Sequence, residues 1–422
     1  MSAGFGATLR RLREEAGLSL AALAQQVHYS KGHLSKVESG QKPPSAQLAR
    51  LCDAAVGAGG ALVRLVGPGG PGGEEPEPSD VDGPVWSVGV GPGGAGFFAP
   101  GDGSAAEGLS RMTFGVPGAA TGTPALLDAF RLRFASARAL GQVAGPAAVL
   151  PGLIADAQTL RALAATAAAS ERPALWRLAA RYAEYAGWMT QEAGDDRMAL
   201  WWTDVAVRLA GLGGDATLEP YALVRRADVA LYHDDALSTI TFAQRAQQAE
   251  HATDRVRGLA AQREAQGHAL AGDHDACLRA LDRSVALLAA AETDPVVLAL
   301  GSTNTPDLAS LIGGWCAYDL GRPDEAAEIL DSGITRFAPG SHRARGRYVT
   351  RAALAHCAAG ELDRACALMN LVLDEVTALD SATIRHDLRE LTRVLARWHT
   401  HQPARELRQR LLAALRAPQA WS

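Results

Sequence analysis

A short signature recurs through the second half of this 422-residue chain. In each copy a glycine follows a small residue or Leu, a polar or acidic residue comes next, and Ala and Leu or Met follow closely. The copies are AGDDRMALWW (193–202), AGDHDACLRAL (271–281), LGRPDEAAEIL (320–330) and AGELDRACALM (359–369), with YHDDALSTI (232–240) as a degenerate copy that lacks the glycine. Their spacing gives a period near 39 residues, with one insertion at 291–307. From residue 124 onward, Ala, Leu and Arg dominate, which predicts helix almost throughout.

Small residues accompany the signature at fixed distances. Seven positions before the glycines stand Gly187, Ala265, Gly314 and Ala353, and five positions after them stand Ala199, Cys277, Ala326 and Ala365. Small residues at these places let paired helices approach closely. The pattern predicts repeated helix–turn–helix units and resembles the tetratricopeptide family, whose usual period of about 34 residues is shorter. The resemblance implies a superhelix with a concave inner wall; an irregular all-α bundle is the alternative.

The stretch from Ser19 to Pro44 predicts two short helices joined by a tight turn. Ser19 and Ser30 stand at N-cap positions, Gly40 ends the second helix, and Pro43 with Pro44 prevents its continuation. The preceding segment GATLRRLREEAG reads as an amphipathic helix, with Leu9, Leu12 and Ala16 on one face and Arg10, Arg11 and Arg13 pointing elsewhere.

Residues 5–66 resemble the Xre/Cro/phage-repressor helix-turn-helix family through LxxLREEAGLS, LAxxxxxSxxxLSKVESG and KPPS. The resemblance implies a five-helix domain whose third helix enters the major groove of double-stranded DNA. Base-edge contacts are then expected from Lys31, Gly32, His33, Ser35 and Lys36, and phosphate contacts from Ser30, Gln41 and Lys42. Lysine donates to guanine N7 and O6, which favours a guanine-containing half-site. Leu20 departs from the family, where Gln is frequent. A solvated basic face on a protein-interaction module is the alternative.

Charge is distributed unevenly. Residues 1–66 carry 8 Lys and Arg against 4 Asp and Glu, whereas the remainder carries 33 against 42. A basic head on an acidic body suits a DNA-binding head, and salt should weaken its binding strongly.

Residues 67–122 contain 17 Gly and 8 Pro, too many for a packed core. Residues 67–84 read as a flexible acidic linker. Strand-like alternation at 84–90 and 110–116 favours a small ribbon, with 96–98 as a further strand. We expect Trp86, Phe97, Phe98 and Phe114 to pack on the C-terminal body; an effector lid or dimer arm is the alternative.

In the tetratricopeptide family the first helix of each pair lines the groove. Counted from the glycines, the inward positions are Glu184, Trp188, Gln191, Gln262, Gln266, Trp315, Tyr318, Arg347 and Thr350. Aromatic faces with amides suit an extended peptide or a flat small molecule. Packing or solvation is the alternative for each residue taken singly.

The sequence contains no GxxxxGK[ST], HExxH or GxSxG motif, so we predict no enzyme, cofactor or metal site. His399 and His401 read as a solvated helix end, His233 to Asp235 as a turn, and residues 385–390 as a charged helix face. Five scattered cysteines without a CxxC pair favour a reducing cytoplasm. No signal peptide is recognised, and no apolar run reaches the roughly 18–20 residues of a membrane span.

Together these features predict an all-α chain: a helix-turn-helix domain at 1–66, a linker at 67–122 and tetratricopeptide-like repeats at 123–422. The combination resembles peptide-pheromone regulators of Gram-positive bacteria and related actinobacterial regulators. It implies a cytoplasmic homodimer that binds an inverted-repeat operator and responds to a small-molecule or peptide effector. The alternative is a scaffold whose repeats recruit a partner protein, with the head as a DNA anchor or dimer module.

Overall fold

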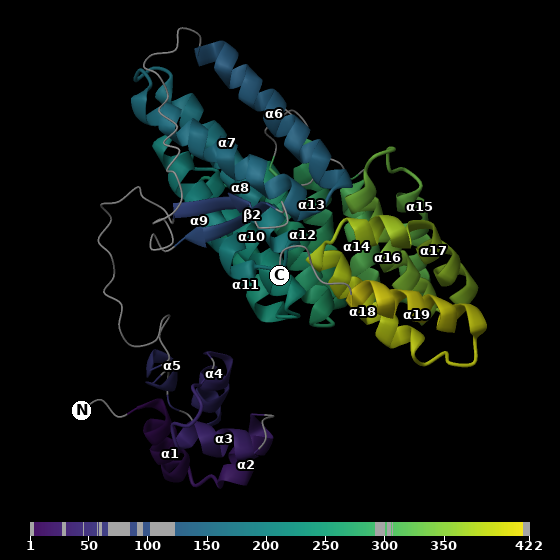
Figure 1. Ribbon diagram of the computed structural model, residues 1–422. Coiled ribbons are helices and arrows are strands. Elements are labelled where there is room, and N and C mark those ends of the chain that lie inside the picture. Colours follow the sequence, from purple (N-terminus) through teal and green to yellow (C-terminus); the bar gives the residue numbers. More distant parts are fainter. Residues whose placement is uncertain are drawn as a thin grey trace. The chain divides into compact units, whose positions relative to one another are not determined.

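The computed structural model describes residues 4–27, 31–44, 46–56, 58, 61–65, 85–90, 96–101, 123–291, 300, 301, 305 and 307–416 (Figure 1). The chain divides into two compact units, residues 1–107 and 108–422. Nearly all described elements are helices, as the sequence predicts.

The head contains α1 (Phe5–Glu15), α2 (Leu20–Gln26), α3 (Lys31–Glu38), α4 (Ala46–Ala55) and α5 (Ala61–Leu65). Its core is built from one apolar face of each helix: Phe5, Leu9, Leu23, Leu34, Val37, Leu48, Cys52 and Leu62. Ser19 caps α2 as predicted, because its hydroxyl accepts from the Ala22 N–H at 3.0 Å. Gly40 follows α3 with a φ of 74°, the left-handed conformation that ends a helix.

Arg13 does not point to solvent with Arg10 and Arg11, so that part of the sequence prediction is wrong. It is buried between α1 and α3, where its Nε donates to Glu38 Oε1 at 2.7 Å and its Nη1 donates to the Leu18 carbonyl at 2.9 Å. The hydrogen bond to Glu38 raises the pKa of Arg13 further, against the opposing effect of burial. The guanidinium therefore joins two helices and the turn that follows the first.

Two strands follow the head, β1 (Val85–Val90) and β2 (Gly96–Gly101). They pair antiparallel, with Val85 opposite Gly101 and Val90 opposite Gly96. The expected strand at 84–90 thus pairs with the segment containing residues 96–98. Residues 110–116 and the side chains of Trp86, Phe97, Phe98 and Phe114 lie outside the described parts of the chain.

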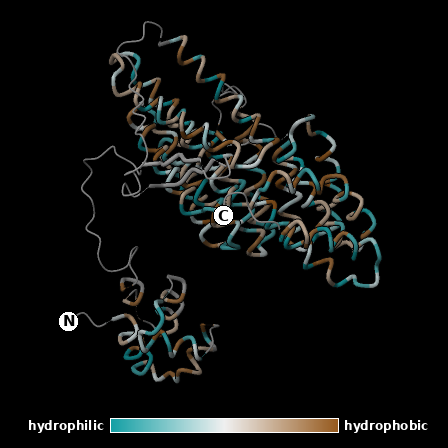
Figure 2. Tube along the Cα trace, viewed as in Figure 1, coloured by the Kyte–Doolittle hydropathy of each residue, from teal (hydrophilic) through white to brown (hydrophobic). Residues whose placement is uncertain are grey.

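The described residues between 123 and 416 form helices that pair in antiparallel fashion and stack. The helices are α6 (Thr123–Val143), α7 (Pro146–Thr166), α8 (Arg172–Glu192), α9 (Asp196–Leu212), α10 (Leu218–Tyr232), α11 (Ala236–Gln248), α12 (Asp254–Leu270), α13 (His274–Ala290), α14 (Leu308–Asp319), α15 (Pro323–Ile334), α16 (His342–Ala358), α17 (Leu362–Ala378), α18 (Ala382–Leu395) and α19 (Gln402–Arg416). Apolar and polar residues alternate along these helices (Figure 2), as expected for helices that bury only part of their surface. The regular pairing matches the repeat prediction rather than an irregular bundle.

Each predicted turn lies between the two helices of a pair. The four glycines of the signature, Gly194, Gly272, Gly321 and Gly360, all have φ between 74° and 92°. The degenerate copy places Asp234 at the same point with a φ of 55°. An aspartate then caps the next helix in three of the five turns: Asp195, Asp235 and Asp273 accept from the backbone N–H three residues on. A backbone requirement therefore explains the repeated sequence.

The small residues of the signature lie where paired helices touch. A Cβ on Gly187 would lie 3.1 Å from the Ala199 carbonyl oxygen, and one on Gly314 would lie 2.8 Å from Leu330. Ala199 and Cys277 are fully buried in the same way on the second helices. Any larger residue would push the paired helices apart.

The superhelix is tightly wound, so that distant repeats meet. Helix α8 contacts α18, and α6 packs against both α8 and α16. A pocket that is partly open to solvent lies among these helices, where the sequence predicts a groove, and it is called the interior cavity below.

Candidate DNA-binding helix and interior cavity

Helix α3 separates its apolar and polar residues cleanly. Leu34 and Val37 are buried in the head's core, whereas Lys31, Gly32, Ser35 and Lys36 lie toward solvent. Five of the predicted DNA-contacting positions thus lie on one helix, with His33 half-buried among them. Two charges and two small residues on one exposed helical face can enter a groove and donate hydrogen bonds to base edges.

Gln41 and Lys42 lie just beyond α3 and are exposed. The Lys42 ammonium lies 3.4 Å from His33 Nδ1, which ties the loop to the helix. Ser30, expected to cap α3 and to contact phosphate, lies outside the described residues. The structure therefore places the loop cation at the edge of the same face that carries Lys31 and Lys36.

Gly32 is not required by packing within the head. A Cβ built on it would meet no atom within 4 Å, and its backbone is helical. Glycine inside a helix costs about 1 kcal/mol relative to alanine. A residue that weakens the helix without easing any internal contact suits a position where another molecule approaches the backbone closely.

Leu20, the departure from the family pattern, has a structural role. It is partly buried and packs against the core of the head. An apolar residue there stabilises the start of α2 but cannot donate a hydrogen bond to a phosphate.

The interior cavity of the repeat region has a volume of about 130 Å³. Five of the nine predicted groove residues line it: Glu184, Trp188, Gln262, Trp315 and Arg347. They come from α8, α12, α14 and α16, so the first helices of the pairs do form the inner wall. Helices α6 and α10 complete it. The other lining residues are Arg138, Gln142, Tyr185, Tyr221, Val224, Arg225, Asp228, Tyr232, Leu259, Arg263, Gly301, Thr305, Leu308, Ile312, Arg343, Ala344 and Tyr348.

The remaining four predicted groove residues do not line this cavity. Gln191 is buried and accepts from Arg225, and Gln266 is buried and accepts from Arg263. Thr350 is fully buried and donates to the Gly346 carbonyl of its own helix at 2.8 Å. Tyr318 lines a neighbouring hollow formed by α10, α14, α16 and α18.

The arginines of the cavity other than Arg347 were not predicted from the sequence: Arg138, Arg225, Arg263 and Arg343. A signal for some of them exists in the sequence. Arg343, Arg347 and Arg351 recur every four residues and therefore lie on one face of α16. A regular cationic stripe on a helix that is otherwise buried indicates an interior polar site, because charge is rarely buried without a partner.

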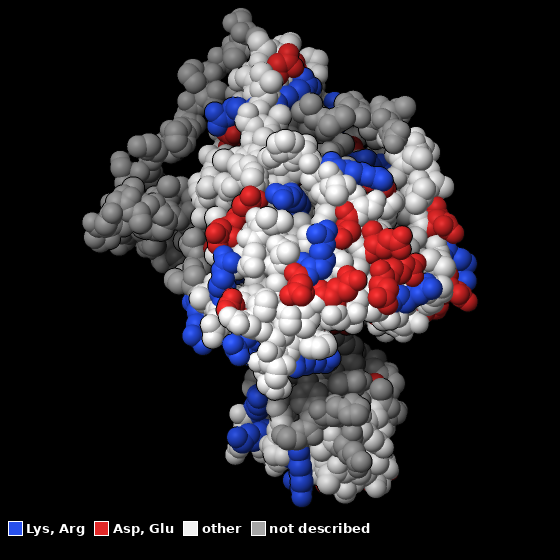
Figure 3. Space-filling view, turned by 90° about the vertical axis from the view of Figure 1, so that its right-hand side faces the viewer, with Lys and Arg blue, Asp and Glu red and all other residues white. Residues whose placement is uncertain are grey.

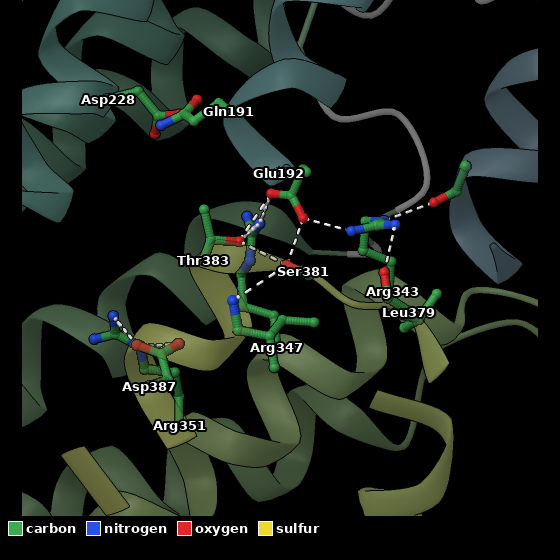
Figure 4. Close-up of polar contacts among 12 residues, drawn as sticks. Gln191, Glu192, Asp228, Arg343, Arg347, Arg351, Leu379, Ser381, Thr383 and Asp387 are labelled. Carbon is green, nitrogen blue, oxygen red and sulfur yellow. Dashed lines mark hydrogen bonds and ion pairs between the residues drawn. The ribbon is translucent and has the colours of Figure 1, made fainter. Parts of the chain in front are cut away.

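An ionic cluster lies beside the cavity, centred on Glu192 at the end of α8 (Figure 4). Arg343 donates to Glu192 Oε2 at 2.5 Å and Arg347 donates to Oε1 at 2.8 Å. The hydroxyls of Ser381 and Thr383 also donate to the two carboxylate oxygens, at 2.5 and 2.8 Å. Burial disfavours the charged form, but Arg347, Arg343 and the two hydroxyls outweigh it and lower the pKa of Glu192 to about 2. The cluster joins α8, α16 and α18.

Residues 385–390 are not simply a charged, solvated face, which corrects the sequence interpretation. Asp387 is buried and forms an ion pair of 2.7 Å with Arg351. The Arg351 guanidinium also lies 3.5 Å from the centroid of the Trp315 ring. This region therefore fixes α18 to α16 and, through Trp315, to α14.

His233 to Asp235 form the predicted turn: His233 Nε2 lies 2.9 Å from Asp196 Oδ2, and Asp235 caps α11. His399 is exposed, and His401 caps α19 by accepting from the Ala404 N–H at 3.3 Å. Within the described parts of the chain, no group of three or more His, Cys, Asp or Glu residues could hold a metal ion. No described helix is both long and apolar enough to span a bilayer.

The outer surfaces carry charge differently. On the face drawn in Figure 3, the visible charges of the head are Lys and Arg, whereas the repeat region displays both signs, with Asp and Glu gathered at one side. This agrees with the sequence-level division into a basic head and an acidic body.

Residues 5–66 match a family model described as a helix-turn-helix domain. This part of the chain is a helix-turn-helix domain. The match ends where the head ends and leaves the repeat region unassigned.

No curated protein matches the chain. Among solved structures, the chain is similar to that titled "Crystal Structure of Bacillus thuringiensis PlcR in complex with the peptide PapR7 and DNA". The identity is 10%, the TM-score is 0.31, and the alignment covers 87% of this chain and 100% of that chain. A likeness at this score is too weak to transfer a property of that protein to this chain.

Proposed function

We propose that this protein is a sequence-specific DNA-binding transcriptional regulator that acts as a homodimer. Its α3 reads base edges in the major groove, and its repeat region binds a signal molecule that modulates DNA binding. The single observation that supports this best is the exposed face of α3 in a head that matches a helix-turn-helix domain. In that motif the second helix is the one that enters the groove.

The chemistry of the exposed face supports base contact. Lys31 and Lys36 can donate to guanine N7 and O6, and Gly32 lets the backbone come close to the DNA. Gln41 and Lys42 are placed beside the face to contact phosphate oxygens, as are the N–H groups at the helix start. A dimer would present two such helices about one turn of DNA apart and would read an inverted repeat.

The interior cavity supports the sensing half of the proposal. Its walls combine aromatic side chains with a few buried polar groups, which is the usual composition of a small-molecule site. Its size favours a small molecule, or one side chain of a peptide, over an extended peptide. The cluster around Glu192 lies next to it, so that occupancy could change how α8, α16 and α18 are held together.

Footprinting on the DNA flanking the protein's own gene tests the DNA-binding half. We expect protection of an inverted repeat, and we expect Lys36→Ala to abolish sequence-specific protection. Arg11→Ala is the matched control: it removes one exposed positive charge from α1, where Arg11 already pairs with Glu15 at 2.7 Å. If Lys36→Ala protects the same sequence as the unaltered protein does, α3 is not the recognition helix.

The sensing half is tested by repeating the footprint with and without an extract of small molecules from the culture. A change in protection that survives removal of all protein from the extract supports a small-molecule or peptide signal. A change that requires a protein fraction would instead favour a scaffold whose repeats recruit a partner protein.

A further inference from the structure

We infer that the interior cavity binds a small anion that carries a single aromatic ring. This inference rests on the proposed function, because it names the chemical class of the signal. It depends on three independent properties of the cavity: an excess of positive charge on its wall, aromatic walls of limited size, and buried polar atoms without a partner in the described structure.

Positive charge exceeds negative charge in and directly behind the cavity wall. Five arginines line the cavity: Arg138, Arg225, Arg263, Arg343 and Arg347. Two acids line it, Glu184 and Asp228. Arg138 has further interactions and is left out of the balance. Among the other described residues, the ionic partners behind the wall, Glu192 and Arg181, bring the count to five cations against three anions. The excess is carried by Arg263 and Arg347, which are partly exposed and line the cavity, where an anionic ligand would compensate it.

Two carboxylates near the cavity are each shared by two arginines. Asp228 forms ion pairs with two arginines, Arg225 at 2.9 Å and Arg263 at 3.0 Å. At the end of α8, Glu192 is likewise shared by Arg343 and Arg347. Each carboxylate thus balances only one of the two cations that it contacts. An added carboxylate or phosphate in the cavity would restore balance without displacing either acid.

Aromatic rings form much of the remaining wall: Tyr185, Trp188, Tyr221, Tyr232, Trp315 and Tyr348. Two pairs of them contact each other, with ring centroids 5.3 Å apart for Tyr185 and Trp188 and 6.0 Å apart for Tyr232 and Trp315. A cavity of about 130 Å³ is close in size to the ~150 Å³ apolar cavities that accept one benzene ring. These walls suit one flat ring.

An unsatisfied donor fixes the polar end of the site. Gln262 is 1% exposed, lines the cavity, and has no hydrogen-bond partner for its side-chain N–H group among the described residues. The hydroxyl of Tyr232, on the facing helix α10, also lacks a partner within the described structure. Buried donors of this kind are normally satisfied in a working state. The oxygens of a carboxylate or phosphate would accept from both.

Calorimetric titration of the full chain without DNA tests the inference with three probes. Benzoate and phenyl phosphate carry the anion, and benzamide has the shape of benzoate without the charge. We expect saturable binding of at least one anion at one per chain, at least tenfold tighter than that of benzamide. Comparing the affinities of benzoate and phenyl phosphate then shows which anion the site prefers.

Two variants locate the binding. Gln262→Leu keeps the volume but removes the donor, and we expect at least a tenfold loss of anion affinity with little change for benzamide. Val224→Phe fills the cavity from α10 and should abolish binding of all three probes. Gln402→Leu, on the exposed start of α19, is the control and should bind as the unaltered chain does. Circular dichroism confirms that each variant is folded.

The inference is overturned if neither anion binds at millimolar concentration, if benzamide binds as tightly as the anions, or if Val224→Phe leaves binding intact. Any of these results leaves the proposed regulator standing, provided that footprinting shows operator protection that a different extractable compound modulates. Conversely, anion binding without any operator protection would support the cavity's ligand class and overturn the DNA-binding half of the proposal.

Discussion

Glu192 and Arg343 are 151 residues apart in the sequence, yet their side chains form an ion pair of 2.5 Å that excludes solvent almost completely. Arg343 also donates to the carbonyls of Gly141 and Ala144 at the end of α6, at 2.6 and 2.7 Å. One guanidinium thus connects α6, α8 and α16. Because the first and later repeats meet at this point, the pair holds the superhelix in its tight winding.

Glu192→Gln should therefore destabilise the repeat region strongly. The substitution keeps the shape but leaves the buried Arg343 and the partly buried Arg347 without their counter-charge, which costs about 3–5 kcal/mol. Urea unfolding followed by circular dichroism measures the loss. Glu375→Gln is the matched control, because Glu375 is a surface residue paired with His342 at 2.8 Å and should cost less than about 1 kcal/mol. Equal losses from the two variants would contradict a special role for Glu192.

The same pair should make the protein sensitive to acid. The pKa of Glu192 is about 2 in the fold and 4.5 for a free side chain, so its charged form is favoured by folding. Its contribution to stability is complete above about pH 4.5 and is lost as the pH falls toward 2. We expect the stability difference between the unaltered chain and Glu192→Gln to shrink steadily between pH 5 and pH 3. A constant difference across that range would show that ionisation of Glu192 is not the cause.

The stability that Asp319 contributes should depend on pH in the opposite direction. Burial raises its pKa to about 6, against the attraction of Arg351, and its Oδ2 has no hydrogen-bond partner in the described structure. Because the folded pKa exceeds the free value, stability from this group is present below about pH 4 and is lost as the pH rises to about 6. Asp319→Asn should raise the melting temperature at pH 7.5 and have little effect at pH 4. A larger gain at pH 4 than at pH 7.5 would contradict this assignment.

In the head, Arg13→Met should loosen the contact between α1 and α3. The side chains of Arg13 and Glu38 are 10% and 8% exposed, so removal of the cation leaves Glu38 almost buried and costs about 3 kcal/mol. Hydrogen exchange of the full chain should show faster exchange in α1 and α3 while the repeat helices stay unchanged. Arg11→Met removes an exposed cation and serves as the control. Equal exchange in the two variants would refute the role of Arg13.

Features that depend on neighbours in the sequence could be predicted. Ser19 caps α2, Gly40 ends α3, and the repeat glycines mark the turns, because each requirement is set by the local backbone. The small partners of those glycines were also recognised correctly, since the spacing from the turn fixes which positions face the paired helix. Gly314 and its contact with Leu330 illustrate this.

Features that depend on distant parts of the chain could not be predicted. Arg13 reads as one more exposed arginine until Glu38 is brought beside it, and Asp387 reads as solvated until Arg351 meets it. The sequence places Thr350 on the wall of a groove, but the structure buries it, and contacts of α6 with α8 and α16 bring distant helices together. Helical periodicity in the sequence reveals which residues share one face of a helix. The curvature of the stacked helices decides which other helices that face contacts.

The degenerate turn offers the sharpest check on the repeat model. Asp234 adopts a φ of 55° where the other four copies place glycine. A side chain in the left-handed region is strained, although aspartate tolerates it better than most residues. Asp234→Gly should relieve the strain and stabilise the repeat region by about 0.5–1 kcal/mol, despite the added freedom of the unfolded chain. A shift of the urea midpoint to higher concentration measures the gain.

Asp275→Gly makes the same chemical change at an exposed helical position of α13 and should destabilise the protein by a similar amount. If both variants lose stability equally, the left-handed backbone at Asp234 is not strained. The absence of glycine from that copy then does not lower the free energy of unfolding.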